Sequence, residues 1–418
     1  MRVSSQKIWF FIGLVCSLSG ASFAVLEPWD ELNDPVQFDP SYVRNVYELP
    51  KSGALEKTPW ADTYWPSIDG GVAHRWQVSP NFQALSSQNK VIRSQYAPYV
   101  NDSMVYQPYS IEQALQLSPR DFQRQSSPIE RLGFITEKAK LRNGQHYFDS
   151  LLYKERERLQ QQLAQGGGYW RGWEGLCNGW AIASLLHPEP TKKSIQASIK
   201  LTQQSQDMTL EFASSDIKGL LALFYQQKLN EFYNGKIQLN YKSLGTRCGD
   251  KPFVTKDVRG LKYTNPCGDL NAGAFHLVMT NEIGRLKRGF VMDMDGSDAV
   301  WNHPIASYRY QFEAYNTGEV VKYQKSRGSH PNTQYEVRVF MWVKYQQELA
   351  HHEDAQGEVF NKNLLAEKQY QYRLEIGAND EILGGSWETG DHPDFAWRLD
   401  PIPFDGFFKA LDHLVPKQ

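Results

Sequence analysis

The stretch GLCNGWA (175–181) places a single cysteine, Cys177, between two glycines at 175 and 179 and ahead of an apolar run that continues to Leu186. This run predicts a helix from Cys177 to Leu186, which should stop at His187 and Pro188. A helix N-terminus carries partial positive charge and unpaired N–H groups, which stabilise a thiolate and can receive an oxyanion. We therefore expect Cys177 to be a nucleophile with a lowered pKa. The alternative, a cysteine buried for packing, stays open at this point.

A nucleophilic cysteine needs a base, and the base needs a group that orients it. His276 lies in AFHLVMTNEI (274–283), which we predict to be a strand. Asp293 lies in GFVMDMD (289–295), the next predicted strand. Antiparallel strands joined by a turn would bring the two side chains together. Asp295 faces the same side two residues later and is the alternative orienter. For a histidine in an apolar strand, the competing interpretation is a core residue with its hydrogen bonds satisfied.

The N-terminus has the pattern of a secretory signal peptide. Basic residues precede the apolar segment IWFFIGLV (8–15), and a small-x-small cleavage site follows at 22–24. The apolar segment is too short to span a membrane. We predict a signal peptide over residues 1–24 and a chain that is secreted or periplasmic.

Export limits the roles of the remaining cysteines. Cys16 would leave with the signal peptide, or carry a lipid under an alternative lipoprotein interpretation. Cys248 and Cys267 lie near each other in a loop-like stretch, and an oxidising compartment favours a disulfide between them. Cys177 would then be the unpaired thiol, which in an exported protein is either an intermolecular link or a reactive group.

The elements that would position these residues predict an α+β fold. SPIE (127–130) has the pattern of a helix capping box, and residues 215–225 form a buried helical run. Apolar residues alternate along 335–345 and 370–376, which is typical of strands. Helices come first and strands follow, so we expect an antiparallel sheet. Residues 25–165 form an irregular, then helical extension.

This extension is predicted to act as a lid or pro-region, and residues 166–418 to form the catalytic domain. The formal net charge is −2, which gives no indication of nucleic-acid or anionic-membrane binding. No stretch approaches the ~20 apolar residues of a membrane helix. The oligomeric state is left open by the sequence.

The order of cysteine, histidine and aspartate resembles the papain-like transglutaminase core. GLCNGWA is similar to the active-site motif Gly-Gln-Cys-Trp-Val-Phe-Ala at Gly175, Cys177 and Ala181, although the Gln and the Trp are absent. Three further stretches resemble the narrower transglutaminase elicitor family. They are AGAFHLVMTN (272–281), VWNHPI (300–305) and GGSWETGDHPDFAW (384–397).

The resemblance implies a transglutaminase that joins glutamine-containing and lysine-containing proteins, or small amines, through isopeptide bonds. Cys177 would be the nucleophile, His276 the general base and acid, and Asp293 or Asp295 the orienter. A backbone N–H and an indole N–H would hold the oxyanion, and aromatic side chains would favour an amine over water. The candidate cleft residues are Trp173, Trp180 and Trp301.

No cofactor is required by this chemistry. DMDGSD (293–298) imitates a calcium loop without the distal Glu, so calcium is kept only as an alternative. Two other functions compete with the transglutaminase. The same triad in a papain-like peptidase or amidase hydrolyses when water is the acceptor. A catalytically silent binding module is the third hypothesis.

Overall fold

A computed structural model gives the structure of the chain and describes twelve stretches of it. The predicted signal peptide, Cys16, Trp173, Cys248, Cys267 and Asp295 lie outside these stretches, so the predictions made on them stay predictions. The described residues are 29, 32–66, 71–73, 116–136, 175–200, 205–247, 255–256, 263–264, 269–294, 300–349, 364–389 and 391–417.

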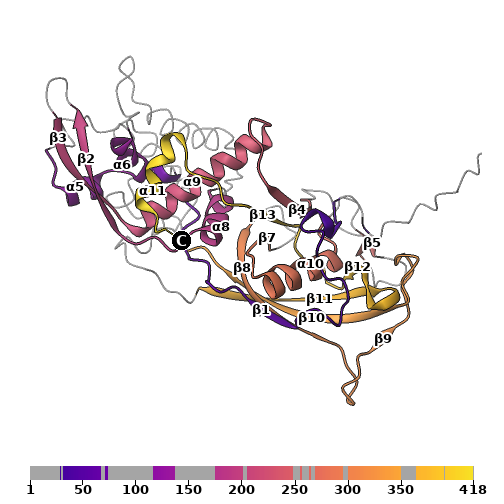
Figure 1. The fold of residues 1–418 in the computed structure, drawn as a ribbon. Coiled ribbons are helices and arrows are strands. Elements are labelled where there is room, and N and C mark those ends of the chain that lie inside the picture. The colour runs from indigo at the N-terminus through magenta and orange to yellow at the C-terminus, as the bar shows by residue number, and fades with distance from the viewer. Residues whose placement is uncertain are drawn as a thin grey trace, which may run out of the picture.

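The main sheet is antiparallel in each of its described strand pairs and curves along its length (Figure 1). Its strand order is β12-β11-β10-β8-β7-β13-β4, and the short strands β1 and β9 pair with β8 and β10. The long strands form where apolar side chains alternate, as predicted for 335–345 and 370–376. The bounds are β1 Ser52–Ala54, β4 Tyr241–Gly245, β7 Val291–Asp293, β8 Asn302–Phe312, β9 Lys322–Tyr323, β10 Tyr335–Gln346, β11 Leu365–Ile376, β12 Ile382–Trp387 and β13 Phe395–Leu399.

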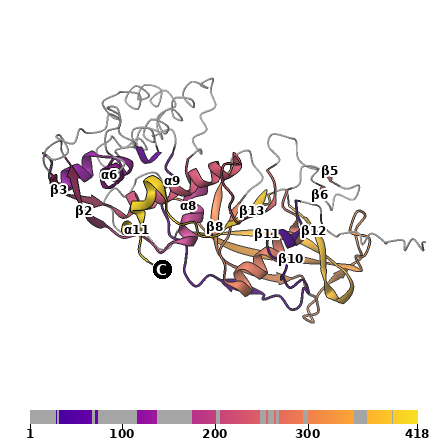
Figure 2. The ribbon, with the colours of Figure 1, turned by 45° about the horizontal axis from the view of Figure 1, so that its top comes forward.

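Most of the helices gather at one end of the molecule, beside the main sheet (Figure 2), whereas α10 (Ala272–Val278) packs on β11 and β12. Helix α8 runs from Cys177 to Leu186, as predicted, and packs on both α9 (Ser214–Tyr233) and β8. Gly179 permits the α8–α9 contact, because a Cβ there would overlap the backbone of Ala222. The other elements are α5 Pro119–Gln125, α6 Pro128–Ile135, α10 Ala272–Val278, α11 Leu411–Leu414, the π-helix η5 Met279–Leu286, the short helices η1 Pro35–Gln37, η3 Gly71–Ala73, η6 Ala378–Asp380 and η7 Gly406–Ala410, and the hairpins β2 Lys193–Lys200 with β3 Ser205–Phe212 and β5 Thr255–Lys256 with β6 Tyr263–Thr264.

The predicted α+β class with an antiparallel sheet is confirmed, and the residues that the structure describes form two hydrophobic cores. One core lies among the helices, and the other lies between α10 and the main sheet. The N-terminal extension contributes to both: Trp65 belongs to the first core and Phe38 to the second, while β1 adds to the sheet. The described part of the extension is therefore integral to the fold. A removable lid or pro-region would have to lie outside it.

A buried ion pair fixes the helical part of the extension. Ser127 and Glu130 form the predicted capping box at the start of α6. The next residue, Arg131, forms an ion pair with Asp216 of α9, and both side chains are fully buried. Arg131 also donates to the carbonyl oxygens of Gln123 and Ser126. This pair ties α6 to the helix that supports α8.

One predicted element is wrong. Residues 274–283 form α10 and the start of η5, not a strand. An uninterrupted apolar run fits a buried helix as well as a buried strand. Here Asn271 decides for the helix, because its side chain caps the helix by accepting the N–H of Gly273 at 2.8 Å. Gly273 has no Cβ and lies directly against the backbone of Gly384 in β12.

Candidate functional site

Cys177 is a free cysteine at the first residue of α8, and 7% of its surface is exposed. Its Sγ lies 3.3 Å from Oδ1 of Asn178 and 3.9 Å from the carbonyl oxygen of Val300. The backbone N–H groups of Asn178 and Asn302 are directed at the sulfur. The helix start and the beginning of β8 thus meet at the thiol, and their N–H groups suit a negative charge there.

The resting thiol is nevertheless protonated. Burial is the largest influence and raises the pKa of Cys177 from about 9 to about 12. The carboxylates of Glu348 and Asp293 raise it further, and the two backbone N–H groups only partly offset this. The expectation of a lowered pKa at the helix N-terminus is therefore wrong for the unliganded site. Burial raises the pKa of the thiol more than the N–H groups at the helix N-terminus lower it. A reaction at Cys177 requires a base.

Two asparagines join the helix to the sheet beside Cys177. Nδ2 of Asn302 donates to Oδ1 of Asn178 at 2.8 Å, and Oδ1 of Asn302 accepts from the indole of Trp397 at 2.8 Å. Asp293 lies on β7, as predicted, and Oδ1 accepts the backbone N–H of Trp301 at 2.9 Å. These bonds hold the segment 300–302 against the sulfur.

His276 lies far from the thiol. Its ring is fully buried, with Nδ1 2.7 Å from the hydroxyl of Tyr372 and the ring centroid 4.7 Å from that of Tyr310. Tyr310 follows Asn302 by eight residues on β8, which is about 26 Å at the rise of a strand. Allowing about 11 Å for the Tyr310 side chain and the ring separation leaves roughly 15 Å to Cys177. Direct proton transfer requires hydrogen-bond reach, about 3 Å. The contacts of Cys177 do not include His276, and the assignment of His276 as the base stays a prediction.

His303 is a histidine that the structure places beside the N-terminal half of α8, whereas His187 caps its C-terminal end. His303 follows Asn302 directly on β8, and its ring lies edge-on to Trp180, one helical turn after Cys177, at 6.3 Å between centroids. Sequence reasoning quoted VWNHPI (300–305) without giving its histidine a role. A histidine at the start of a strand, inside a motif that carries the family resemblance, was the signal that could have found it.

A segment of the N-terminal extension, Asp62–Trp65, forms one wall of the site. The carbonyl of Tyr64 accepts the N–H of Leu176, directly before Cys177, at 2.6 Å. The carbonyl of Asp62 accepts the N–H of Leu349, next to Glu348, at 2.9 Å. Gly175 allows this approach, since a Cβ there would overlap Tyr64. We call Asp62–Trp65 the strap.

The tryptophans predicted to line the cleft lie in different parts of the structure. The half-buried ring of Trp301 packs edge-to-face with Tyr64 of the strap, 6.0 Å between centroids, which puts an aromatic pair beside Cys177. Trp180 is fully buried in the helical core, and its indole N–H makes no hydrogen bond with a described residue. Trp173 lies outside the described residues. Of the three, the described geometry suits Trp301 best as a cleft residue.

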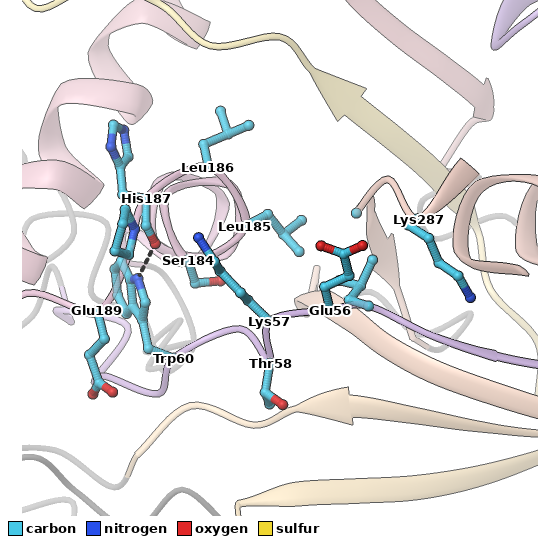
Figure 3. A pocket seen from close by; sticks show the side chains of 13 residues that line it. Glu56, Lys57, Thr58, Trp60, Ser184, Leu185, Leu186, His187, Glu189 and Lys287 are labelled. Carbon is cyan, nitrogen blue, oxygen red and sulfur yellow. Dashed lines mark hydrogen bonds between the residues drawn. The ribbon is translucent and has the colours of Figure 1, made fainter. Parts of the chain in front are cut away.

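A cavity of about 370 Å³ lies at the opposite end of α8 from Cys177 (Figure 3). Trp60 and His187 line it, and the Trp60 indole donates to the His187 carbonyl at 3.0 Å. Lys57, Glu56 and Ser184 complete much of its wall. Cys177 is not among the lining residues, so this cavity is separate from the candidate site.

The structure tests the metal and membrane predictions only in part. Asp295 and Asp298 of the calcium-like stretch fall outside the described ranges. Within those ranges no three or more His, Cys, Asp or Glu side chains are grouped so as to hold a metal ion. None of the helices that the structure describes has the length and apolar character needed to cross a membrane.

Comparison with known proteins gave one family and one solved structure. The family described as "Transglutaminase elicitor" matches residues 135–404, more than half of the chain. The crystal structure of the GP42 transglutaminase from Phytophthora sojae is similar over 91% of this chain and 94% of that chain, with 19% sequence identity and a TM-score of 0.49. A comparison with curated proteins found no match.

Proposed function

The chain belongs to the transglutaminase elicitor family, as its motifs led us to expect, and from this membership we propose that it is a transglutaminase with Cys177 as its nucleophile. The observation that carries the proposal is the thiol itself. Cys177 is free, begins a helix, and faces two backbone N–H groups at the junction of α8 and β8. This is the arrangement that acyl transfer through a thioester needs.

In the proposed reaction, Sγ of Cys177 attacks the side-chain carboxamide of a glutamine in a protein. The N–H groups of Asn178 and Asn302, which face the sulfur in the resting site, are the nearest described donors for the developing oxyanion. Ammonia leaves and a thioester remains. A lysine amine then attacks the thioester, and an isopeptide bond forms. The aromatic pair of Tyr64 and Trp301 offers an apolar approach for the alkyl chain of that amine.

The substrates and the compartment follow from the same proposal. Glutamine-containing and lysine-containing proteins, or small amines, would be the partners. The signal-peptide pattern at the N-terminus would export the chain, so the substrates would be extracellular or periplasmic. Neither a metal nor another cofactor takes part in the proposed steps.

Incorporation of a fluorescent primary alkylamine into a glutamine-rich protein tests the proposal. The wild-type chain should label the protein, and Cys177→Ala should not. Ser184→Ala, two turns along the same helix, should label at the wild-type rate and serves as the matched control. Cleavage of the acceptor without labelling would indicate a cysteine peptidase. Neither cleavage nor labelling would indicate a binding module.

A further inference from the structure

The base that Cys177 requires must come from the elements around the sulfur. Helix α8 and the first residues of β8 surround the sulfur, and Asn302 of β8 directs its N–H at Sγ. His303 is the next residue of the same strand. Its ring packs against Trp180 of α8 and, 4.9 Å away, against Tyr345 of β10. The imidazole is thus held between the helix that carries the thiol and the neighbouring strand.

The contacts of His303 fix the orientation of its ring. Nδ1 lies 3.0 Å from the carbonyl oxygen of Gln346 and 3.3 Å from Oε2 of Glu348. Both acceptors favour a proton on Nδ1, so the lone pair of the neutral ring lies on Nε2. A histidine held in this tautomer has its basic nitrogen on the ring edge opposite the acceptors.

Glu348 connects His303 with the thiol electrostatically. Its carboxylate contacts the His303 ring, and it is also the charged group with the largest influence on Cys177. A carboxylate in this position repels a thiolate on Cys177 and attracts a positively charged imidazolium on His303. A thiolate and an imidazolium formed together would suit the site better than a thiolate alone. The three residues come from α8, from the start of β8 and from the segment that directly follows its antiparallel neighbour β10.

We propose that His303 is the proton-transfer residue of Cys177 and that Glu348 positions it. The proposal rests on the proposed acyl transfer. Nε2 of His303 takes the thiol proton while the sulfur electron pair forms the S–C bond. It then gives that proton to the departing ammonia as the C–N bond breaks. In the second half His303 takes a proton from the attacking amine and returns it to the sulfur as the S–C bond breaks.

Four variants test the assignment in the full-length chain by amine incorporation. His303→Ala should lose about 10²–10⁴-fold in kcat, the usual contribution of general acid–base catalysis. Added imidazole should restore part of that activity, which a merely structural histidine would not allow. His276→Gln should retain amine incorporation if it folds, and His413→Gln, on the exposed face of α11, is the matched control. Thermal midpoints identify variants that fail to fold. If His303→Ala does not fold, His303→Gln is used in its place.

Glu348 is tested by the form of the pH–activity profile. Glu348→Gln removes the carboxylate that favours the imidazolium, so the acidic limb of kcat/KM should move to lower pH while KM for the glutamine protein stays unchanged. Glu348→Asp should restore part of kcat, and the exposed Glu319→Gln should behave as wild type.

Two results overturn the inference and leave the proposed function intact. One is a folded His303 variant with wild-type kcat, and the other is a Glu348→Gln profile that coincides with wild type. A wild-type chain that incorporates no amine would instead overturn the proposed function.

Discussion

The buried pair of Arg131 and Asp216 gives the sharpest stability prediction. Asp216→Asn keeps the size of the side chain and can still accept the N–H of Ala213, which Asp216 caps at 2.7 Å. The substitution therefore removes one negative charge and little else. It leaves the guanidinium of Arg131 in a place with no solvent exposure.

The expected loss of stability follows from these contacts. Removing one partner of a buried ion pair costs about 3–5 kcal/mol, because the other charge is left uncompensated. The carbonyls of Gln123 and Ser126 still accept from Arg131, which places the effect at the lower end, about 3 kcal/mol. That is roughly a 150-fold fall in the ratio of folded to unfolded protein. Burial already lowers the pKa of Arg131, and Asp216 is the group that most opposes this.

Urea denaturation followed by tryptophan fluorescence measures the change. Arg131→Met combined with Asp216→Asn is the matched control, because it removes the stranded charge and fills the same space. Met also leaves the carbonyls of Gln123 and Ser126 without their donor, so the double variant should recover only part of the stability that Asp216→Asn loses. A loss below about 1 kcal/mol for Asp216→Asn alone would refute the reasoning. It would mean that α6 is not anchored to α9 through this pair.

Three further predictions concern the helix that carries the thiol. Because the pKa of Cys177 is raised to about 12, its alkylation by iodoacetamide should accelerate about tenfold per pH unit from pH 7 to 10, and a plateau below pH 9 would contradict this. Burial lowers the pKa of His187 to about 4, so the unfolded chain binds this proton first and unfolding free energy should fall as pH drops from about 6.5 to about 4. His187→Gln should remove only its own part of that dependence in urea titrations at each pH, because burial also lowers the pKa values of His276 and His392. Gly179→Ala should push α8 away from Ala222 and lower the free energy of unfolding by about 1–3 kcal/mol. The thermal midpoint and amine incorporation should fall with it. An unchanged midpoint would show that the helices can adjust.

Helix α8, which begins at Cys177, was predictable because its signals are local. Gly175 lies two residues before Cys177, apolar residues fill the helix, and Pro188 follows its end. The capping box at Ser127 and the alternating strands β10 and β11 were predictable for the same reason. Each of these elements is indicated by residues that are close together in the sequence.

The residues proposed to act with Cys177 were not predictable in this way. His276 was assigned to a strand because its apolar neighbours fit either element, and the cap at Asn271 was overlooked. His303 and Glu348 are 45 positions apart, and they meet because β8 and β10 pair with Ile305 opposite Tyr345. That register depends on the whole sheet. Burial, which reverses the expected pKa of Cys177, likewise arises only when the layers assemble.

The strap has a consequence for heat inactivation. Cys177 belongs to the helical layer, whereas His303 and Glu348 belong to the sheet, and the strap binds residues next to the thiol on one side and next to Glu348 on the other. A small separation of the two layers would break the alignment of these groups while each core stayed folded. Enzymatic activity would therefore be lost at a lower temperature than secondary structure. The strap acts as a clamp, and its hydrogen bonds set how far apart those two temperatures lie.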